Sequence, residues 1–346
     1  MSVDLGLGPD QEAIAELFDG FFEKESPSSV ARAAEPLGHD PELWAKVVEL
    51  GAPGMGSPES AGGGGASVSD LVVVAEALGR AIAPVPLVEH LSALAVLDDS
   101  SFDAADLVAG EAVAALALRP AAADGTWTLV PGGAVADVVV GVDGDELVAV
   151  RSAPPMAAPA NHACAPIADR SARAGERTVL GPAAAVAPAL DRWKVLTAGA
   201  MVGISESALA LALEYVNARY QFGVPIGSFQ SVQHGLADLP VLIDGGRLLT
   251  HKAAWAMDGH GDGSVDWRMV EIQDGPTLAS MAFLFTTDGA ATATHRSLHY
   301  HGGYGFSEEY DIQLYHRRAR GWAYVLSDPT DESLALADRL FGPVEA

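Results

Sequence analysis

The stretch Arg219-Tyr-Gln-Phe-Gly-Val-Pro-Ile-Gly-Ser-Phe-Gln-Ser-Val-Gln233 decides the fold, because it separates two long segments with helical spacing. We expect those helices over residues 194–221 and 229–257. Gly223, Pro225 and Gly227 predict a tight turn between them. Two long helices joined by a short turn are antiparallel neighbours, so the stretch predicts one end of a helical bundle. An ordinary helix–helix corner has the same pattern.

Side chains in this stretch suit a phosphorylated ligand. Arg219 is near the turn, where a guanidinium can bind two phosphate oxygens. Gln221 and Gln230 add neutral hydrogen-bonding groups, and Phe222 can cover an adenine or seal the turn.

A second stretch, His299-Tyr-His-Gly-Gly-Tyr-Gly-Phe-Ser307, follows a third predicted helix at residues 277–299. Gly302 and Gly303 leave the backbone open to another chain or to a ligand. Free amides in such a turn, together with a following helix N-terminus, suit an anion. We expect Ser307 to cap that next helix, with two glutamates in its first turn.

Together the two stretches read Arg-x-x-Phe-Gly-x-Pro-Ile-Gly-x-Phe-Gln-x-x-Gln and, further on, His-Gly-Gly-x-Gly-Phe. This combination closely resembles the acyl-CoA dehydrogenase family. The segments Leu236-Ala-Asp238, 311–319 and 71–86 also resemble it. The resemblance is strong over residues 190–325, moderate over 1–100 and weak over 100–185.

The expected fold is an α+β multidomain protein of the acyl-CoA dehydrogenase type. Residues 1–110 form an N-terminal helical domain, 111–185 a small middle β-sheet domain and 186–346 a C-terminal four-helix bundle. Helical periodicity supports the first domain at 10–22, 41–50 and 70–83. Short β-branched runs at 126–130, 135–142 and 146–150 support the second, whereas the Ala/Pro segment 153–166 predicts a loop.

In the family, FAD lies at a subunit interface. The resemblance therefore implies that this chain contacts the pyrophosphate and adenine of an FAD seated mainly on a neighbouring subunit. His299 stands where the family usually has Gln, three residues before the Gly-Gly pair. The implied cofactor-binding residues are Arg219, Gln221, Phe222, Gly223, Gln230, His299, Gly302 and Gly303.

The family needs a carboxylate to remove the α-proton of the acyl-CoA thioester. The two places where the family carries it correspond to Trp193 and Val325 here, and neither side chain can act as a base. Asp191 and Asp328 are close in sequence to these positions and are the remaining candidates. The middle domain also lacks the family's Thr-Glu-Pro-x-x-Gly-Ser-like flavin cradle, which residues 116–125 replace, although Trp127 could still stack.

These departures favour a subunit without its own active site, paired with a second acyl-CoA dehydrogenase-like subunit in an α2β2 heterotetramer. Some actinobacterial members of the family resemble this arrangement. Two alternatives stay open: a complete homomeric enzyme with Asp191 or Asp328 as base, and a non-enzymatic assembly scaffold.

Bulk properties exclude several other classes. A net charge of −26 over 346 residues argues against a nucleic-acid or anionic-membrane partner. The single cysteine, Cys164, permits no intrachain disulfide, which fits a reducing cytoplasm, and the N-terminus has no signal-peptide pattern. His295, His299 and His301 lack acidic or cysteine companions, so we expect no metal.

Overall fold

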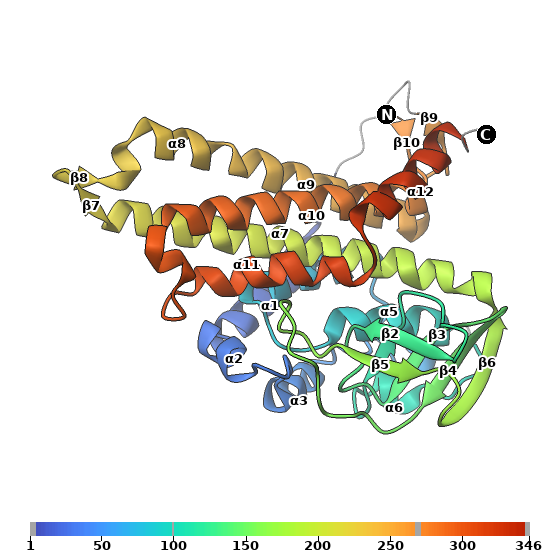
Figure 1. Ribbon diagram of the computed structural model, residues 1–346. Coiled ribbons are helices and arrows are strands. Elements are labelled where there is room, and N and C mark those ends of the chain that lie inside the picture. Colours follow the sequence, from blue (N-terminus) through green and yellow to red (C-terminus); the bar gives the residue numbers. More distant parts are fainter. Residues whose placement is uncertain (1–4, 99, 267–270, 343–346) are drawn as a thin grey trace.

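The computed structural model describes residues 5–98, 100–266 and 271–342, which form three parts. A long helical bundle runs across the molecule, with the N-terminal helices below one half and a β domain below the other (Figure 1). This is the predicted α+β architecture of an N-terminal helical domain, a middle β domain and a C-terminal four-helix bundle, and the fold class is confirmed.

The N-terminal part is helical because its apolar residues recur at helical spacing and polar residues cap its helices. Asp40 accepts hydrogen bonds from the backbone N–H groups of Glu42 and Leu43, and Ser67 accepts one from Asp70. The helices are α1 Pro9–Glu25, α2 Ser28–Ala33, α3 Pro41–Glu49, α4 Val68–Ala81, α5 Leu87–Leu97 and α6 Ala105–Val108.

The middle part is a small sheet in the order β1-β3-β4-β6, with β1 parallel to β3 and the remaining neighbours antiparallel. A separate antiparallel pair joins β2 to β5. Almost every residue of β3 is buried, as in a central strand covered on both faces. The strands are β1 Ala114–Leu116, β2 Thr126–Val130, β3 Val138–Asp143, β4 Glu146–Arg151, β5 Ala168–Ser171 and β6 Glu176–Pro182.

The C-terminal part is the bundle of α7, α9, α10 and α11, with α8 extending it toward one end and α12 crossing its other end (Figure 1). Its longest helix, α7, also packs closely on α4. A Cβ added at Gly79 would lie 2.1 Å from the carbonyl oxygen of Ala200, and one at Gly203 equally close to that of Glu76. These glycines let the two helices touch along their backbones. The helices are α7 Ala187–Ala218, α8 Gln230–Ala237, α9 Leu239–Trp255, α10 Gly275–Tyr300, α11 Ile312–Gly321 and α12 Pro329–Phe341.

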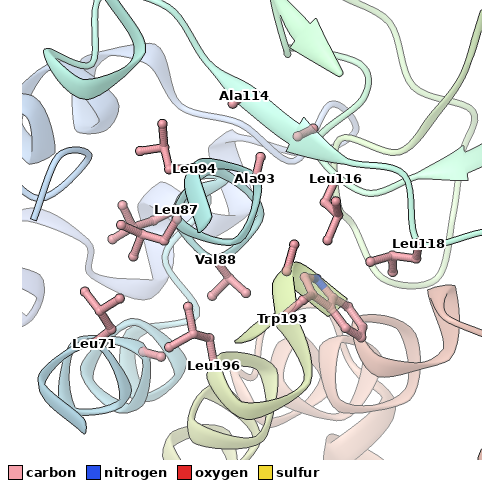
Figure 2. Close-up of a cluster of buried hydrophobic side chains, with 14 of the residues drawn as sticks. Leu71, Leu87, Val88, Ala93, Leu94, Ala114, Leu116, Leu118, Trp193 and Leu196 are labelled. Atoms are coloured by element: carbon pink, nitrogen blue, oxygen red, sulfur yellow. The ribbon is translucent and has the colours of Figure 1, made fainter. Parts of the chain in front are cut away.

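Among the described residues, one helical stretch, Ala183–Ala218, is long and apolar enough to cross a membrane. Its most apolar window is 72% buried inside the protein, as expected for a core helix. Figure 2 shows this core where Trp193 and Leu196 of α7 meet Val88 of α5 and Leu116 of β1.

Three predicted boundaries were wrong. The first long helix ends at Ala218, so Gln221 lies outside it, in the hairpin that follows. The second predicted helix is two helices that meet at Asp238, where Pro240 in the first turn of α9 has no N–H to continue the hydrogen-bond ladder of α8. Ser307 caps no helix, because α11 begins only at Ile312.

Candidate FAD-binding and subunit-contact site

A two-residue hairpin forms the tip of the bundle. Strands β7 Tyr220–Gln221 and β8 Val224–Pro225 pair antiparallel directly after α7. The two residues between them, Phe222 at φ 54° and Gly223 at φ 83°, both adopt the left-handed conformation. Such a tight hairpin turn favours this conformation. Glycine adopts it freely, whereas phenylalanine does so at a cost in conformational energy, which places strain at the outermost point of the chain.

The fold brings the two stretches that the sequence singled out into contact. The Arg219 guanidinium carbon lies 5.8 Å from the centre of the Tyr304 ring, a cation–π contact between the end of α7 and the loop after α10. Tyr304 in turn packs on Tyr310, with ring centres 5.2 Å apart. Within the described ranges, Arg219 forms no ion pair with a carboxylate. Its charge is therefore available to an external anion.

Large apolar side chains are unusually exposed around Arg219. Phe222 is 93% exposed, Phe306 79% and Tyr220 60%. Burying such rings is worth several kcal/mol in total at about 25 cal/mol per Å². An exposed aromatic group of this size marks a surface that another molecule covers.

The remaining predicted cofactor-binding residues are exposed at the same end. A Cβ added at Gly302 or Gly303 would meet nothing within 4 Å, so the backbone there is open. Gln221 and Gln230 are exposed on the hairpin and at the start of α8. His299 is exposed too, but it lines a separate groove between α8 and α10, beside Tyr300.

A cavity of about 50 Å³ lies in the interior, between the bundle, α5 and the middle domain. Trp193 and Val325, the two positions where the family carries its base, both line this cavity. The structure thus places the two positions on the wall of one cavity. Both side chains are apolar parts of the cavity wall, and Trp193 is buried, with its ring packed on that of Phe283.

One acidic residue that the sequence reasoning missed, Glu89, also lines the cavity. It comes from the first turn of α5, a helix that the reasoning did not predict. Burial raises the pKa of Glu89 to about 7. The signal in the sequence was present: Glu89 is the one acid within an apolar run from Leu87 to Leu97.

The two aspartates considered as substitute bases lie elsewhere. Asp328 caps α12 by accepting from the backbone N–H of Thr330. Hydrogen bonds from the side chain and then the backbone of Thr330 hold the pKa of Asp328 below its ordinary value. Asp191 is buried 3.9 Å from Lys194, and burial raises its pKa. Neither aspartate lines the cavity.

Residues 161–167, which we term the strap, form one wall of the cavity. Trp322 donates its indole N–H to the carbonyl oxygen of Ala163 at 3.1 Å, and Arg317 contacts the Cys164 sulfur at 2.7 Å. A Cβ at Gly321 would lie 2.3 Å from the Ala163 Cα. The strap is therefore wedged tightly against the end of α11.

The middle domain gives Trp127 a structural role. Its side chain is fully buried and donates to the carbonyl oxygen of Val142 at 2.8 Å, so it is not free to stack on a ligand. Histidines in the bundle are also engaged: His301 contacts the Ser297 carbonyl oxygen at 2.7 Å and stacks on Tyr215. No group of residues that could hold a metal ion is found in the described part of the chain.

Comparisons with known proteins identify the family of the chain. Residues 8–98 match the N-terminal domain of acyl-CoA dehydrogenases and residues 183–324 match their C-terminal domain. The two ranges leave the middle β domain between them. The chain is 31% identical over 332 residues to acyl-CoA dehydrogenase IpdE2 of Mycobacterium tuberculosis, covering 93% of this chain and 94% of that protein. It is 29% identical over 340 residues to IpdE2 of Mycolicibacterium smegmatis, covering 97% and 100%.

Solved structures give the same result. A chain of a variant of the Tcur3481–Tcur3483 steroid ACAD superposes with a TM-score of 0.83 at 25% identity, covering 96% of this chain and 98% of that one. A chain of the ChsE4–ChsE5 complex from Mycobacterium tuberculosis superposes equally well at 23% identity, covering 99% and 100%, which shows the shared fold. This chain belongs to the acyl-CoA dehydrogenase family.

Proposed function

We propose that this chain is the non-catalytic subunit of a flavin-dependent acyl-CoA dehydrogenase, which desaturates an acyl-CoA thioester between its α and β carbons. The observation that carries the proposal is the position of Arg219. It lies at an exposed aromatic tip, beside an open glycine loop, where a neighbouring subunit can be reached. Its role is to complete the FAD site of that neighbour.

The residues at the tip fit the phosphate end of FAD. The Arg219 guanidinium has no carboxylate partner among the described residues, and a fork of N–H donors matches two phosphate oxygens. Gly302 and Gly303 leave space for close approach of the pyrophosphate. The ring of Phe222 offers a flat apolar surface to the adenine. FAD, when bound, would supply the hydride acceptor, while Arg219, Gln221, Phe222, Gly223, Gln230, Gly302 and Gly303 would orient its distal end.

The base is assigned to the partner because the interior cavity of this chain is unsuited to the reaction. Trp193 and Val325 fill the positions of the base, and the strap, held by Trp322, forms one wall of the cavity. A cavity of about 50 Å³ holds only a few atoms, far fewer than an acyl-CoA thioester brings. The ChsE4–ChsE5 complex, which shares the fold, joins two different proteins. A second acyl-CoA dehydrogenase-like subunit in an α2β2 assembly is the corresponding partner here.

The test is to purify the chain alone and together with the acyl-CoA dehydrogenase-like chain encoded beside it. We expect the lone chain to carry little FAD and to show no desaturation, and the complex to carry stoichiometric FAD. Stoichiometric FAD and turnover in the lone chain would refute the division of labour.

Variants separate the two alternatives. A complete homomeric enzyme using Asp191 or Asp328 requires that the corresponding Asp→Asn variant loses turnover while it keeps FAD. A non-enzymatic scaffold requires that Arg219→Ala leaves the FAD content of the complex unchanged. We expect neither result.

A further inference from the structure

A surface groove of about 380 Å³ lies between α8 and α10, near the hairpin tip. α8 follows the hairpin after one short turn, so the groove adjoins the surface proposed to meet the partner (Figure 1). His234 of α8 and His295 and His299 of α10 line the groove, and all three are exposed. Three of the ten histidines of the chain therefore line one surface groove.

The charge of the groove depends on these imidazoles. Of the described residues that line it, Asp238 is the one acid, and its carboxylate pairs with Arg296 at 2.9 Å. Because that pair is neutral as a whole, the groove has no net charge when the imidazoles are neutral and three positive charges when all are protonated. Imidazoles gain protons as the pH falls from 8 to 6. The groove therefore attracts carboxylates and other anions increasingly in mild acid.

The two helices that form the groove are tied together. Arg296 also donates to the Gly235 carbonyl oxygen at 3.1 Å, and the Tyr300 hydroxyl donates to the Ser231 carbonyl oxygen at 3.2 Å. A Cβ added at Gly235 would lie 1.8 Å from the Tyr300 hydroxyl oxygen, so a larger residue does not fit there. The groove is thus formed before a partner arrives, which lowers the entropic cost of binding.

Neighbouring groups on α11 and the strap leave this charge pattern unchanged. His316 of α11 packs on His295, with ring centres 6.0 Å apart. Burial, followed by the charge of Arg320, lowers the pKa of His316 to about 4, and His295 and His162 contribute less. His316 therefore stays neutral between pH 6 and 8, while Arg320, exposed on α11, adds positive charge at every pH.

We propose that this groove binds an acidic segment of the partner subunit, whose carboxylates accept hydrogen bonds from His234, His295 and His299. The chain has a net charge of −26, so most of its surface repels an anionic segment, whereas the protonated groove attracts one. The inference rests on the proposed function, because it requires the heteromeric partner. It adds a regulatory property, namely assembly that tightens as the pH falls.

The experiment measures the Kd between the two purified subunits at pH 6, 7 and 8 by analytical ultracentrifugation. Each exposed ion pair strengthens binding by about 1.5-fold to fivefold, so three of them should make the Kd about tenfold lower at pH 6 than at pH 8. The bound state favours protonated imidazoles, so the gain is present in mild acid and is lost as the pH rises. Because exposed charges are screened, 0.5 M NaCl should remove most of the difference.

Replacing the three histidines tests whether they cause the pH dependence. The combined variant His234→Gln, His295→Gln and His299→Gln keeps neutral hydrogen-bonding groups and removes the titration. Its Kd should stay near the wild-type value at pH 8 throughout the range, and thermal unfolding of the lone chain should match the wild type. His260→Gln is the matched control, because His260 is an exposed histidine after α9, and it should keep the full pH dependence.

A second variant acts in the opposite direction. Asp238→Asn removes the carboxylate that pairs with Arg296 and leaves the guanidinium free to meet a carboxylate of the partner. This variant should lower the Kd at pH 8 by about 1.5-fold to fivefold.

Three results would overturn the groove as a binding site and leave the proposed function intact: a Kd that does not change with pH, a pH dependence that survives in the combined histidine variant, or weaker assembly of Asp238→Asn at pH 8. A surviving pH dependence would mean that acid acts only by reducing the overall repulsion between the subunits. No complex at any pH would contradict both this inference and the proposed function.

Discussion

Replacing Arg219 with alanine should weaken FAD binding by the assembled enzyme while the chain itself stays folded. Arg219 is exposed at the end of α7, and its contact with Tyr304 is worth about 0.5–1 kcal/mol to the free chain. A hydrogen bond from a guanidinium to a charged phosphate contributes about 1.5–3 kcal/mol. Losing the hydrogen bond to phosphate therefore corresponds to roughly a 10-fold to 150-fold rise in the Kd for FAD, because each 1.4 kcal/mol of binding free energy is a factor of ten in Kd.

The assay is titration of the FAD-depleted complex with FAD, followed by flavin fluorescence, alongside thermal unfolding of the lone chain. Arg219→Lys keeps the charge but loses the planar fork of donors, so its Kd should fall between those of the wild type and Arg219→Ala. Arg173→Ala is the matched control: Arg173 pairs with Asp143 in the middle domain, and its removal should leave FAD affinity unchanged. A Kd for Arg219→Ala within threefold of wild type would refute the assignment of this residue to the phosphate.

Three further predictions concern the partner surface, the core and the strap. Phe222→Asn should prevent assembly with the partner, and it should leave the chain folded because asparagine tolerates the left-handed conformation. Leu129→Asn, at a left-handed position that is 47% exposed, should assemble normally by size-exclusion chromatography. Glu76→Gln should lower the free energy of unfolding by about 3 kcal/mol near neutral pH. The variant should also lose less of its remaining stability than the wild type as the pH falls, which urea unfolding between pH 3 and 7 would measure. Gly321→Ala should lower the free energy of unfolding by about 1–3 kcal/mol and expose the strap to proteolysis. Gly20→Ala, at a helical position with open space around it, should instead raise the free energy of unfolding by about 0.5–1 kcal/mol.

The pH dependence in the second of these predictions follows from the surroundings of Glu76. Burial alone would raise its pKa, but the hydrogen bond with His251 and the charge of Arg247 outweigh burial and lower it below 4.5. A lowered pKa means that this carboxylate stabilises the fold fully above about pH 4.5. Its contribution is lost as the pH falls through the folded-state value. Without the carboxylate, that part of the acid sensitivity disappears.

The sequence predicted the elements whose periodicity is strong and local. The strand at residues 126–130 and the helices near residues 10–22 and 41–50 were found within a few residues of their bounds. The sequence did not reveal β6, whose partly exposed residues give no clear alternation, or the short β1. Both are stabilised by pairing with distant strands, and single-sequence patterns do not contain that information.

The same distinction applies to the site. The Arg219 turn and the Gly302 loop were predicted separately from local motifs, and the structure joins them through the contact with Tyr304. The hairpin at residues 220–225 was not predicted, because a phenylalanine at the left-handed position of its turn is contrary to turn preferences. Glu89 was overlooked because its significance depends on a cavity built by segments far apart in the chain.

The strained, exposed tip and the closely packed interior of this chain suggest that it binds FAD at the tip and leaves the chemical step to the partner. At the tip, Phe222 holds an unfavourable backbone conformation and exposes nearly its whole ring, a combination that natural chains retain where another molecule covers the surface. In the interior, the strap, Trp193 and Val325 line a cavity of only about 50 Å³. A catalytic subunit requires the opposite distribution, with an open interior and an ionised base. We therefore infer that the exposed Arg219 tip, and not the interior, is the part of this chain that acts in desaturation.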